Sequence, residues 1–121
     1  PDLEVLTPRP SSVGLGGELF LHLLASHPDV DAIFFGNDDL AHGALLEAAR
    51  IGIKIPDQVA ILGFNDLPSS EFMVPRLSSI RTPREAIGRR AAEQMLTLMA
   101  GNKVANPVQD MGFELMVRES S

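Results

Sequence analysis

The clearest fold signal in this sequence is the segment Asp31-Ala32-Ile33-Phe34-Phe35-Gly36-Asn37-Asp38-Asp39. After one charged residue comes a continuous apolar run, short enough to be a buried strand, and the Gly-Asn-Asp-Asp cluster ends it. A helix is predicted over residues 40–50, with Gly52 as its carboxyl-terminal cap. Residues 59–62 repeat the buried-strand pattern and lead into Gly63-Phe64-Asn65-Asp66. Two strands joined through one helix predict a βαβ unit, and therefore a parallel sheet with a right-handed crossover.

The flanking sequence predicts further elements on either side of this unit. Residues 3–6 alternate like a strand, and a helix is expected to start at Ser11 or Ser12 and to stop before His27-Pro28. The glycines near the start of that helix favour close packing against a neighbouring element. Further along, the pattern predicts an irregular segment, an amphipathic helix and a final strand, over residues 67–79, 83–100 and 112–117.

Composition limits the classes of function that are open to this chain. It has 121 residues, a net charge of −6, and no Cys, Trp or Tyr. The length allows one modest domain, and the absence of cysteine excludes a thiolate metal site and a cysteine nucleophile. The acidic balance argues against contact between these residues and a nucleic-acid backbone. No apolar run approaches the roughly 18 residues that span a bilayer, so no membrane partner is expected. Because Pro1 cannot be a translation start, we expect the chain to be part of a longer protein.

Polar residues cluster where the predicted strands end, over residues 7–12, 36–39 and 63–66. The carboxyl ends of parallel strands meet at one edge of a sheet, which is where open α/β sheets bind ligands. Asn and Asp side chains on short loops suit hydroxyl-rich ligands, because they donate to and accept from sugar hydroxyls. A purely local alternative stays open: Asp38 or Asp39 caps the following helix, and Asn65-Asp66 forms an Asx-turn.

The patterns typical of enzyme and metal sites are incomplete in this sequence. Asp38 and Asp39 resemble the acidic cluster that holds Mg²⁺ in phosphoryl-transfer proteins, but neither Lys54 nor Lys103 lies at a strand end to neutralise a phosphate. The histidines lack zinc-ligand spacing, the serines lack the Gly-x-Ser-x-Gly elbow, and the glycines lack the full dinucleotide fingerprint. We therefore expect no catalytic residue, no metal ligand and no cofactor, with an Mg²⁺-dependent phosphoryl-transfer domain as one alternative.

Several strings resemble the LacI/GalR family of bacterial transcriptional repressors, in order and in spacing, over nearly the whole chain. They are residues 31–38, 41–45, 55–57, 59–66, 75–80, 87–92 and 114–121. The resemblance implies a truncated α/β fold with a parallel sheet, of the periplasmic-binding-protein-like type (type I), mostly its carboxyl-terminal lobe. It implies that residues 1–77 form that lobe, that 78–106 cross to the amino-terminal lobe and contribute a helix there, and that 107–121 return as the terminal strand.

The same resemblance implies a function: the effector-binding and dimerisation region of a cytoplasmic repressor that is not an enzyme. Its implied partners are a small-molecule effector (a sugar or sugar acid), a second copy in a homodimer, and operator DNA, contacted through a helix-turn-helix headpiece absent from this chain. A periplasmic-type sugar-binding protein of a transport system shares the fold and is the other alternative. The Ile87-Gly88-Arg89-Arg90-Ala91 helix and the Val117-Arg118-Glu119-Ser120-Ser121 ending look like the repressors.

Carried over residue by residue, the resemblance places effector contacts at Asn37 and Asn65, with Ser11 where relatives often have a stacking aromatic, and Asp38 and Asp66 in adjacent positions. Asn65 stands where the family pattern has a carboxylate. This exchange removes a negative charge, and Arg9 lies in the neighbouring loop, so both features favour an anionic ligand. Residues 79–84 and 87–89 are similar to gluconate-operon repressors, so a gluconate-like sugar acid is expected.

The predicted helix over residues 40–50 is apolar on more than one side. One interpretation buries it between the sheet and a loop; the family resemblance instead implies a homodimer interface. That interface would contain Ala41, His42, Leu45, Phe72 and Met73. A histidine there could make association depend on pH. The helix over residues 83–100 is expected to lack its sheet in this chain, so exposed apolar surface, exchange of partners or disorder is predicted for residues 84–106.

Overall fold

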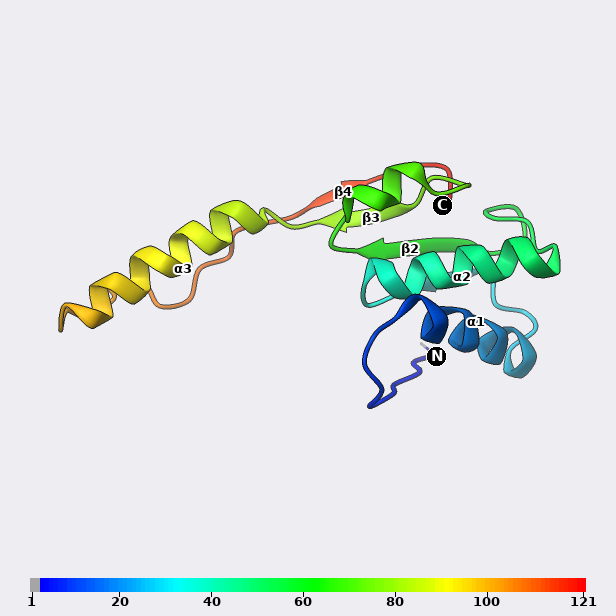
Figure 1. Cartoon of the computed structure of the whole chain (residues 1–121), viewed down its shortest axis with the longest axis horizontal. Coiled ribbons are helices and arrows are strands. Elements are labelled where there is room, and N and C mark those ends of the chain that lie inside the picture. The colour runs from blue at the N-terminus through cyan, green and yellow to red at the C-terminus, as the bar shows by residue number, and fades with distance from the viewer. Residues whose placement is uncertain (1–2) are drawn as a thin grey trace.

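The computed structural model describes residues 3–121 (Figure 1). Along the chain the elements are α1 (Val13–Ser26), β1 (Ala32–Phe34), α2 (Asp38–Ile51), β2 (Ala60–Phe64), the 3-10 helix η1 (Pro68–Phe72), β3 (Ser78–Arg81), α3 (Arg84–Met99) and β4 (Glu114–Met116). The sheet, α1, α2 and η1 form one body, and α3 extends away from it (Figure 1). None of the helices in residues 3–121 is long and apolar enough to cross a membrane.

One mixed sheet organises this body, with strand order β1-β2-β3-β4. The first three strands run parallel, and β4 pairs antiparallel with β3. Ile33 of β1 lies in register beside Ile61 of β2, and α2 connects the two strands, which confirms the predicted βαβ unit. Because the three parallel strands point in one direction, their carboxyl ends share one edge of the sheet.

The core lies between one face of the sheet and the two long helices. Ile33 and Ile61 point into it and are buried together with Phe20 of α1 and Leu45 of α2. On the other face of the sheet, Phe34 is 58% exposed. Leu62 and Ser78 continue this face from Phe34 and are half-buried and fully buried, so the face is exposed at β1 and covered at β3.

Glycine allows α1 and α2 to approach each other closely. A Cβ at Gly16 would overlap the backbone carbonyl of Leu40, and a Cβ at Gly43 would overlap the carbonyl of Val13. Main chain therefore meets main chain between the two helices. This contact confirms the predicted close packing at Gly16, whereas a Cβ at Gly14 would meet no atom of α2.

The carboxyl-terminal residues fill the gap between the starts of β2 and β3. The Ile61 N–H donates to the Ser120 carbonyl over 2.7 Å, and the Ser78 N–H donates to the Ser120 hydroxyl oxygen over 2.8 Å. That hydroxyl donates in turn to the Ile61 carbonyl over 2.6 Å. Ser120 is fully buried and acts as a polar bridge between the two strands.

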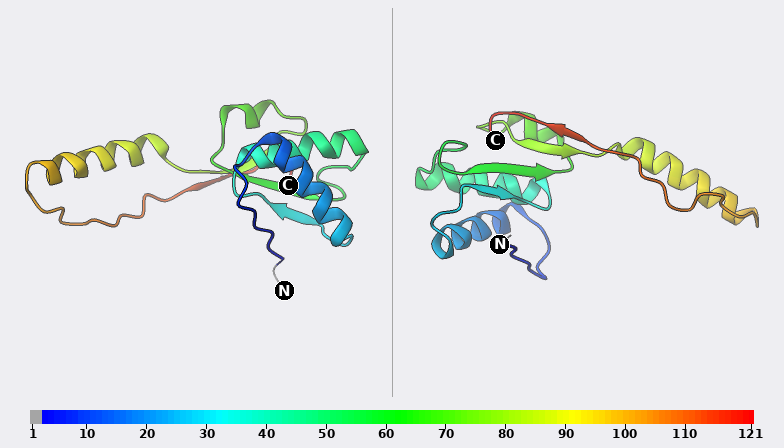
Figure 2. Two further views of the ribbon diagram at one scale, coloured as in Figure 1. Left: turned by 60° about the horizontal axis from the view of Figure 1, so that its bottom comes forward. Right: turned by 180° about the vertical axis from the view of Figure 1, so that it is seen from behind.

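The chain leaves the sheet after Arg81, forms α3, and returns to β4 (Figure 2). No residue of α3 is buried. The exposed apolar side chains of this helix include Met95, Leu96, Leu98 and Met99, as expected for residues 83–100. Ser78–Arg81, predicted to belong to the crossover, is a strand of the main sheet. The assignment of the crossing segment to a second lobe stays a prediction.

Two expectations about strands were wrong. Residues 3–6 form no strand, and Leu6 is 82% exposed; no neighbouring strand pairs with them, and a strand needs such a partner for its backbone hydrogen bonds. Conversely, β3 lies partly in the segment predicted to be irregular. Its two serines, Ser78 and Ser79, are fully buried through hydrogen bonds rather than through apolar contact, so the sequence has no apolar run there.

The helix contact yields a prediction about stability. Replacing Gly16 by Ala should lower the free energy of unfolding by about 1–3 kcal/mol, because the added methyl group overlaps the Leu40 carbonyl. Gly14→Ala, two residues earlier in the same helix, places its methyl group in ordinary contact, 4.0 Å from the Ser12 hydroxyl oxygen, and should be neutral or stabilising by up to about 1 kcal/mol. Urea denaturation of both variants measures the difference; equal unfolding free energies would contradict the close packing.

Candidate functional site

The candidate site lies at the edge where β1, β2 and β3 end. We call this edge the rim and define it by Ser11 before α1, Asn37 after β1, Asn65 after β2 and Arg81 at the end of β3. Three separate strand ends and one helix start thus contribute to it. Each position is fixed by contacts of its own.

Ser11 and Asn37 are joined directly. The Asn37 side-chain amide donates to the Ser11 hydroxyl over 2.7 Å, while its oxygen accepts from the Leu40 N–H over 3.0 Å. Asn37, rather than Asp38 or Asp39, is therefore the N-cap of α2. Ser12 caps α1 in the same way, through Leu15 N–H over 3.0 Å. Ser11 is left exposed at the rim, with Asn37 half-buried beside it.

Asp38 is not exposed at the rim, and its carboxylate instead binds neighbouring segments of the chain. It is fully buried, and its carboxylate accepts from the Ser79 hydroxyl at 2.6 Å, the Ser70 hydroxyl at 2.6 Å and the Leu67 N–H at 2.7 Å. Glycine is required at position 63, since a Cβ there would overlap this carboxylate. Asp38 thus does not reach a ligand at the rim; it holds the segment after β2, η1 and β3 against the start of α2.

The neighbouring Asp39 is exposed, so the two adjacent carboxylates do not share a site. Within residues 3–121 there is no group of three or more His, Cys, Asp or Glu that could hold a metal ion. The described geometry therefore offers no paired carboxylates for Mg²⁺ at this rim.

Asn65 and Asp66 form a tight turn with left-handed backbone, at φ angles of 99° and 49°. Asn and Asp adopt this region more readily than other non-glycine residues. The Asn65 N–H donates to the Ile80 carbonyl over 2.9 Å, which fixes the turn to β3. The Asn65 side chain is half-buried at the rim.

Asp66 is held between two arginines. Its carboxylate accepts from Arg118 over 2.7 Å and from Arg81 over 2.6 and 2.7 Å. Burial disfavours the charged form of Asp66, but the hydrogen bonds and charges of Arg118 and Arg81 outweigh it and lower the pKa of this carboxyl below its usual value. The pKa of Arg118 is raised, chiefly by its hydrogen bond to Asp66. The predicted effector residue Asp66 is therefore occupied by protein partners.

Arg9 is likewise occupied. Its guanidinium pairs with the Glu18 carboxylate over 2.5 Å, and both side chains are more than half exposed. The pair joins the loop before α1 to α1 itself. The positive charge that favoured an anionic ligand in the sequence is thus neutralised locally.

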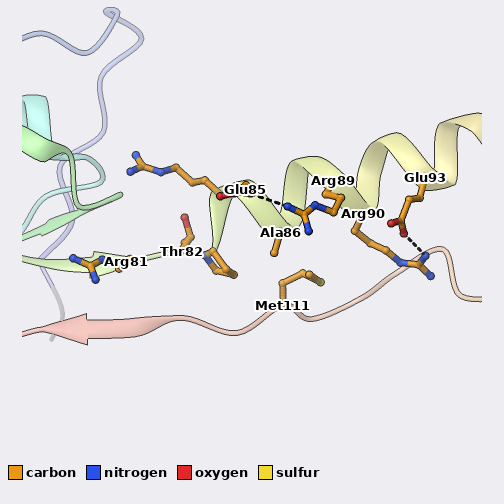
Figure 3. A pocket seen from close by; sticks show the side chains of 10 residues that line it. Arg81, Thr82, Glu85, Ala86, Arg89, Arg90, Glu93 and Met111 are labelled. Carbon is orange, nitrogen blue, oxygen red and sulfur yellow. Dashed lines mark hydrogen bonds and ion pairs between the residues drawn. The ribbon is translucent and has the colours of Figure 1, made fainter.

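Other arginines, none of them predicted to contact the effector, lie next to the rim. Arg81, Arg84, Arg89 and Arg90 line an open groove at the start of α3, which we call the arginine groove (Figure 3). Met111 of the returning segment lies across from the helix in this groove. Four arginines within ten consecutive residues, 81–90, are a signal that the sequence contains.

The predicted dimer residues separate into two groups. Ala41 and Leu45 are 0% and 1% exposed, because they pack in the core of this chain against α1 and the sheet; their assignment to an interface was wrong. Phe72 is 81% exposed, and Met73 is half-buried. His42 is buried, and its Nε2 lies 3.0 Å from the Ser70 hydroxyl oxygen.

The hydrogen bonds that link His42 to Ser70 and Ser70 to Asp38 define which ring nitrogen of His42 carries a proton. Because the Ser70 hydroxyl donates to Asp38, it can only accept from the His42 ring, so Nε2 carries a proton. Burial lowers the pKa of His42 from its ordinary value of 6.5, against the opposing charges of Asp38 and Asp39. The folded protein thus favours the neutral ring.

Comparison with known proteins gives a consistent result. A family model described as a periplasmic binding protein-like domain matches residues 4–121. The chain is 72% identical over 121 residues to the HTH-type transcriptional regulator GntR of Pseudomonas aeruginosa, covering 100% of this chain and 35% of that protein. It therefore spans about a third of the length of the curated relatives it matches.

Solved structures extend the similarity to three dimensions. The crystal structure of the transcription regulator GntR from Chromobacterium violaceum has a TM-score of 0.90 and 45% identity, covering 98% of this chain and 44% of that one. A LacI family transcriptional regulator from Arthrobacter sp. FB24, in complex with lactose, has a TM-score of 0.78 and 27% identity, covering 90% of this chain and 41% of that one. The fold is thus the expected periplasmic-binding-protein-like α/β fold.

The state of His42 predicts how stability depends on pH. The unfolded chain protonates this ring near its ordinary pKa of 6.5 and the folded chain only at lower pH, so between these values the unfolded chain binds more protons. The free energy of unfolding should therefore fall as pH is lowered from about 7 to 5.

Denaturation at several pH values tests this expectation. His42→Gln keeps an N–H donor for Ser70 but does not titrate, so its stability should change less over the same range. His22→Gln, on the exposed surface of α1, is the matched control and should keep the slope of the parent chain. Identical slopes for all three proteins would contradict the role of His42.

Proposed function

Because this chain belongs to the family of periplasmic-binding-protein-like domains, we propose that it is the effector-binding and dimerisation region of a DNA-binding transcriptional repressor. The observation that carries the proposal is the rim. Asn37 and Asn65 follow the parallel strands β1 and β2, and Ser11, just before α1, is hydrogen-bonded to Asn37. This is where ligands bind in open α/β sheets.

The proposed effector is a small hydroxyl-rich molecule, a sugar or a sugar acid. Side-chain amides and hydroxyls donate to and accept from sugar hydroxyls, and the rim offers both kinds of group. The lactose in the related regulator from Arthrobacter supports a sugar-like effector. Asp38 and Asp66 hold the loops in place, and Asn37, Asn65 and Ser11 are the proposed contacts.

Operator DNA is the second proposed partner, contacted by a part of the regulator outside this chain. The Pseudomonas relative is named as an HTH-type (helix-turn-helix) transcriptional regulator, and the chain covers only 35% of that protein. The net charge of −6 is consistent with this division, since DNA backbones are bound by clustered Lys and Arg. We place the intact regulator in the cytoplasm, where its operator lies, and assign it no enzymatic activity.

The proposed dimer surface is re-assigned to exposed residues. Phe72 and Val74 are 81% and 85% exposed, directly after Ser70, which is tied to α2 through His42. Leu46, 57% exposed, lies one helical turn after His42 on the same face of α2. Adjacent exposed apolar residues of this kind are typical of protein interfaces.

The effector role is tested by two substitutions that spare the fold. Asn37→Asp retains the N-cap oxygen but loses the amide donor, and Asn65→Gly keeps a backbone that tolerates positive φ but loses the side chain. Each should weaken effector binding by about fivefold or more, the value of one hydrogen bond of about 1 kcal/mol.

Calorimetric titration of the intact regulator with gluconate, 6-phosphogluconate, glucose and galactose measures this change. Ser69→Ala, at an exposed position of η1, is the control and should bind as the parent does. The proposal fails if none of these compounds binds and none alters operator affinity.

The dimer role is tested by charge. Phe72→Glu in the intact regulator should shift the protein towards monomers in analytical ultracentrifugation, because it places a carboxylate in the proposed apolar surface. Leu21→Glu, at an exposed apolar position of α1, should leave the dimer intact. An unchanged dimer in the Phe72 variant would refute this surface.

A further inference from the structure

The arginine groove contains one cation that differs from the others. Arg81 pairs with Asp66, Arg89 pairs with Glu85 over 2.7 Å, and Arg90 pairs with Glu93 over 3.1 Å. Figure 3 shows the last two pairs along α3. Arg84, by contrast, has no ion pair with any carboxylate of residues 3–121. Its positive charge is therefore not neutralised by the described part of the chain.

Arg84 also reaches back from α3 to the rim. Its guanidinium donates to the backbone carbonyl of Asp66 over 3.4 Å, and Asp66 directly follows Asn65. That single contact to a neutral oxygen leaves the other guanidinium N–H groups for a further acceptor. The side chain thus stands beside a proposed effector contact.

The carboxylates of Asp38, Asp39 and Asp66, close to the rim in sequence, form no ion pair with this guanidinium. Asp66 is held between Arg81 and Arg118, and Asp38 is fully buried among its three donors. Asp39 is the exposed acid of the rim, on the first turn of α2. An anion that enters beside Asn65 would therefore meet one guanidinium, that of Arg84, without a carboxylate partner among residues 3–121.

We propose that Arg84 binds the anionic group of the effector and thereby selects a sugar acid over the neutral polyol of the same length. The planar guanidinium can donate two parallel hydrogen bonds to a carboxylate, a geometry that a hydroxymethyl group cannot match. The inference rests on the proposed effector role of the rim. It replaces Arg9, which Glu18 neutralises, as the source of preference for an anion.

The test uses the intact regulator and two ligands that differ at one carbon: gluconate, with a carboxylate, and glucitol, with a hydroxymethyl group. Glucose 6-phosphate is a third probe, which distinguishes a phosphate from a carboxylate as the bound anion. The variants are Arg84→Gln, Arg84→Lys, and Arg89→Gln as the matched control, an arginine of the same groove that already has a carboxylate partner.

Calorimetry should show that the parent protein prefers gluconate to glucitol. Arg84→Gln should weaken gluconate binding by about 10- to 100-fold, the loss of one charge-assisted interaction, and leave glucitol binding unchanged. Arg84→Lys should recover part of the loss, because it restores the charge without the planar fork. Arg89→Gln should bind like the parent, and thermal melting confirms that each variant is folded.

The outcomes separate this inference from the function on which it rests. If gluconate binds equally well to the parent and to Arg84→Gln, the role of Arg84 is refuted and the effector site stands. If the parent protein prefers glucitol to gluconate, the selection of a sugar acid is likewise refuted. If it prefers glucose 6-phosphate, the guanidinium is assigned to a phosphate instead of a carboxylate, which also overturns the sugar-acid proposal. If no ligand binds to the parent and none changes operator affinity, the effector function itself fails.

Discussion

The buried carboxylate of Asp38 fixes the geometry on which the rim depends. It lies at the start of α2 and accepts hydrogen bonds from Leu67, Ser70 and Ser79, which belong to the segment after β2, to η1 and to β3. An ionised carboxylate without such donors would cost several kcal/mol in a protein interior, so these segments must stay close to α2 for the fold to be stable. Position 63 must be glycine for the same reason, because a Cβ there would overlap the Asp38 carboxylate. The polar residues of the proposed effector site are thus positioned by a buried carboxylate that lies outside it.

A second anion, Asp66, connects the body of the protein to the segment that leads to α3. Arg81 lies at the end of β3, and Arg118 lies just beyond β4, so one carboxylate holds both the departing and the returning chain. The ion pairs of Asp66 also determine which arginines near the rim have a carboxylate partner. Arg81 and Arg118 share the charge of Asp66, and Arg118 also lies 3.5 Å from the Glu71 carboxylate, whereas Arg84 pairs with no carboxylate of residues 3–121. Structural ion pairs therefore decide which cation remains for a ligand.

Local patterns in the sequence predicted the elements that are buried through apolar side chains. They failed for residues that are buried through hydrogen bonds or by segments distant in the sequence. The runs around Ile33 and Ile61 predicted two strands and, with them, the rim. Buried serines made β3 invisible to the same reasoning, because their burial depends on hydrogen bonds to residues 40 or more positions away, such as Ser79 to Asp38 at a separation of 41. Leu45 was assigned to a partner subunit because its helix is apolar on two sides. The second side is covered by α1, which glycines allow to approach more closely than side-chain sizes would predict.

The bridge made by Ser120 also affects the order in which this chain can fold. β2 and β3 are synthesised well before Ser120, yet the Ile61 backbone is satisfied only by that residue, 59 positions later. Loop-closure entropy opposes contacts between such distant residues, and sheets that depend on them form slowly. While α1 and α2 can form from neighbouring residues and β1 can pair with one edge of β2, the other edge at the start of β2 stays unpaired until Ser120 emerges. During that interval the nascent chain exposes a strand edge to other chains, and Ser120 closes it.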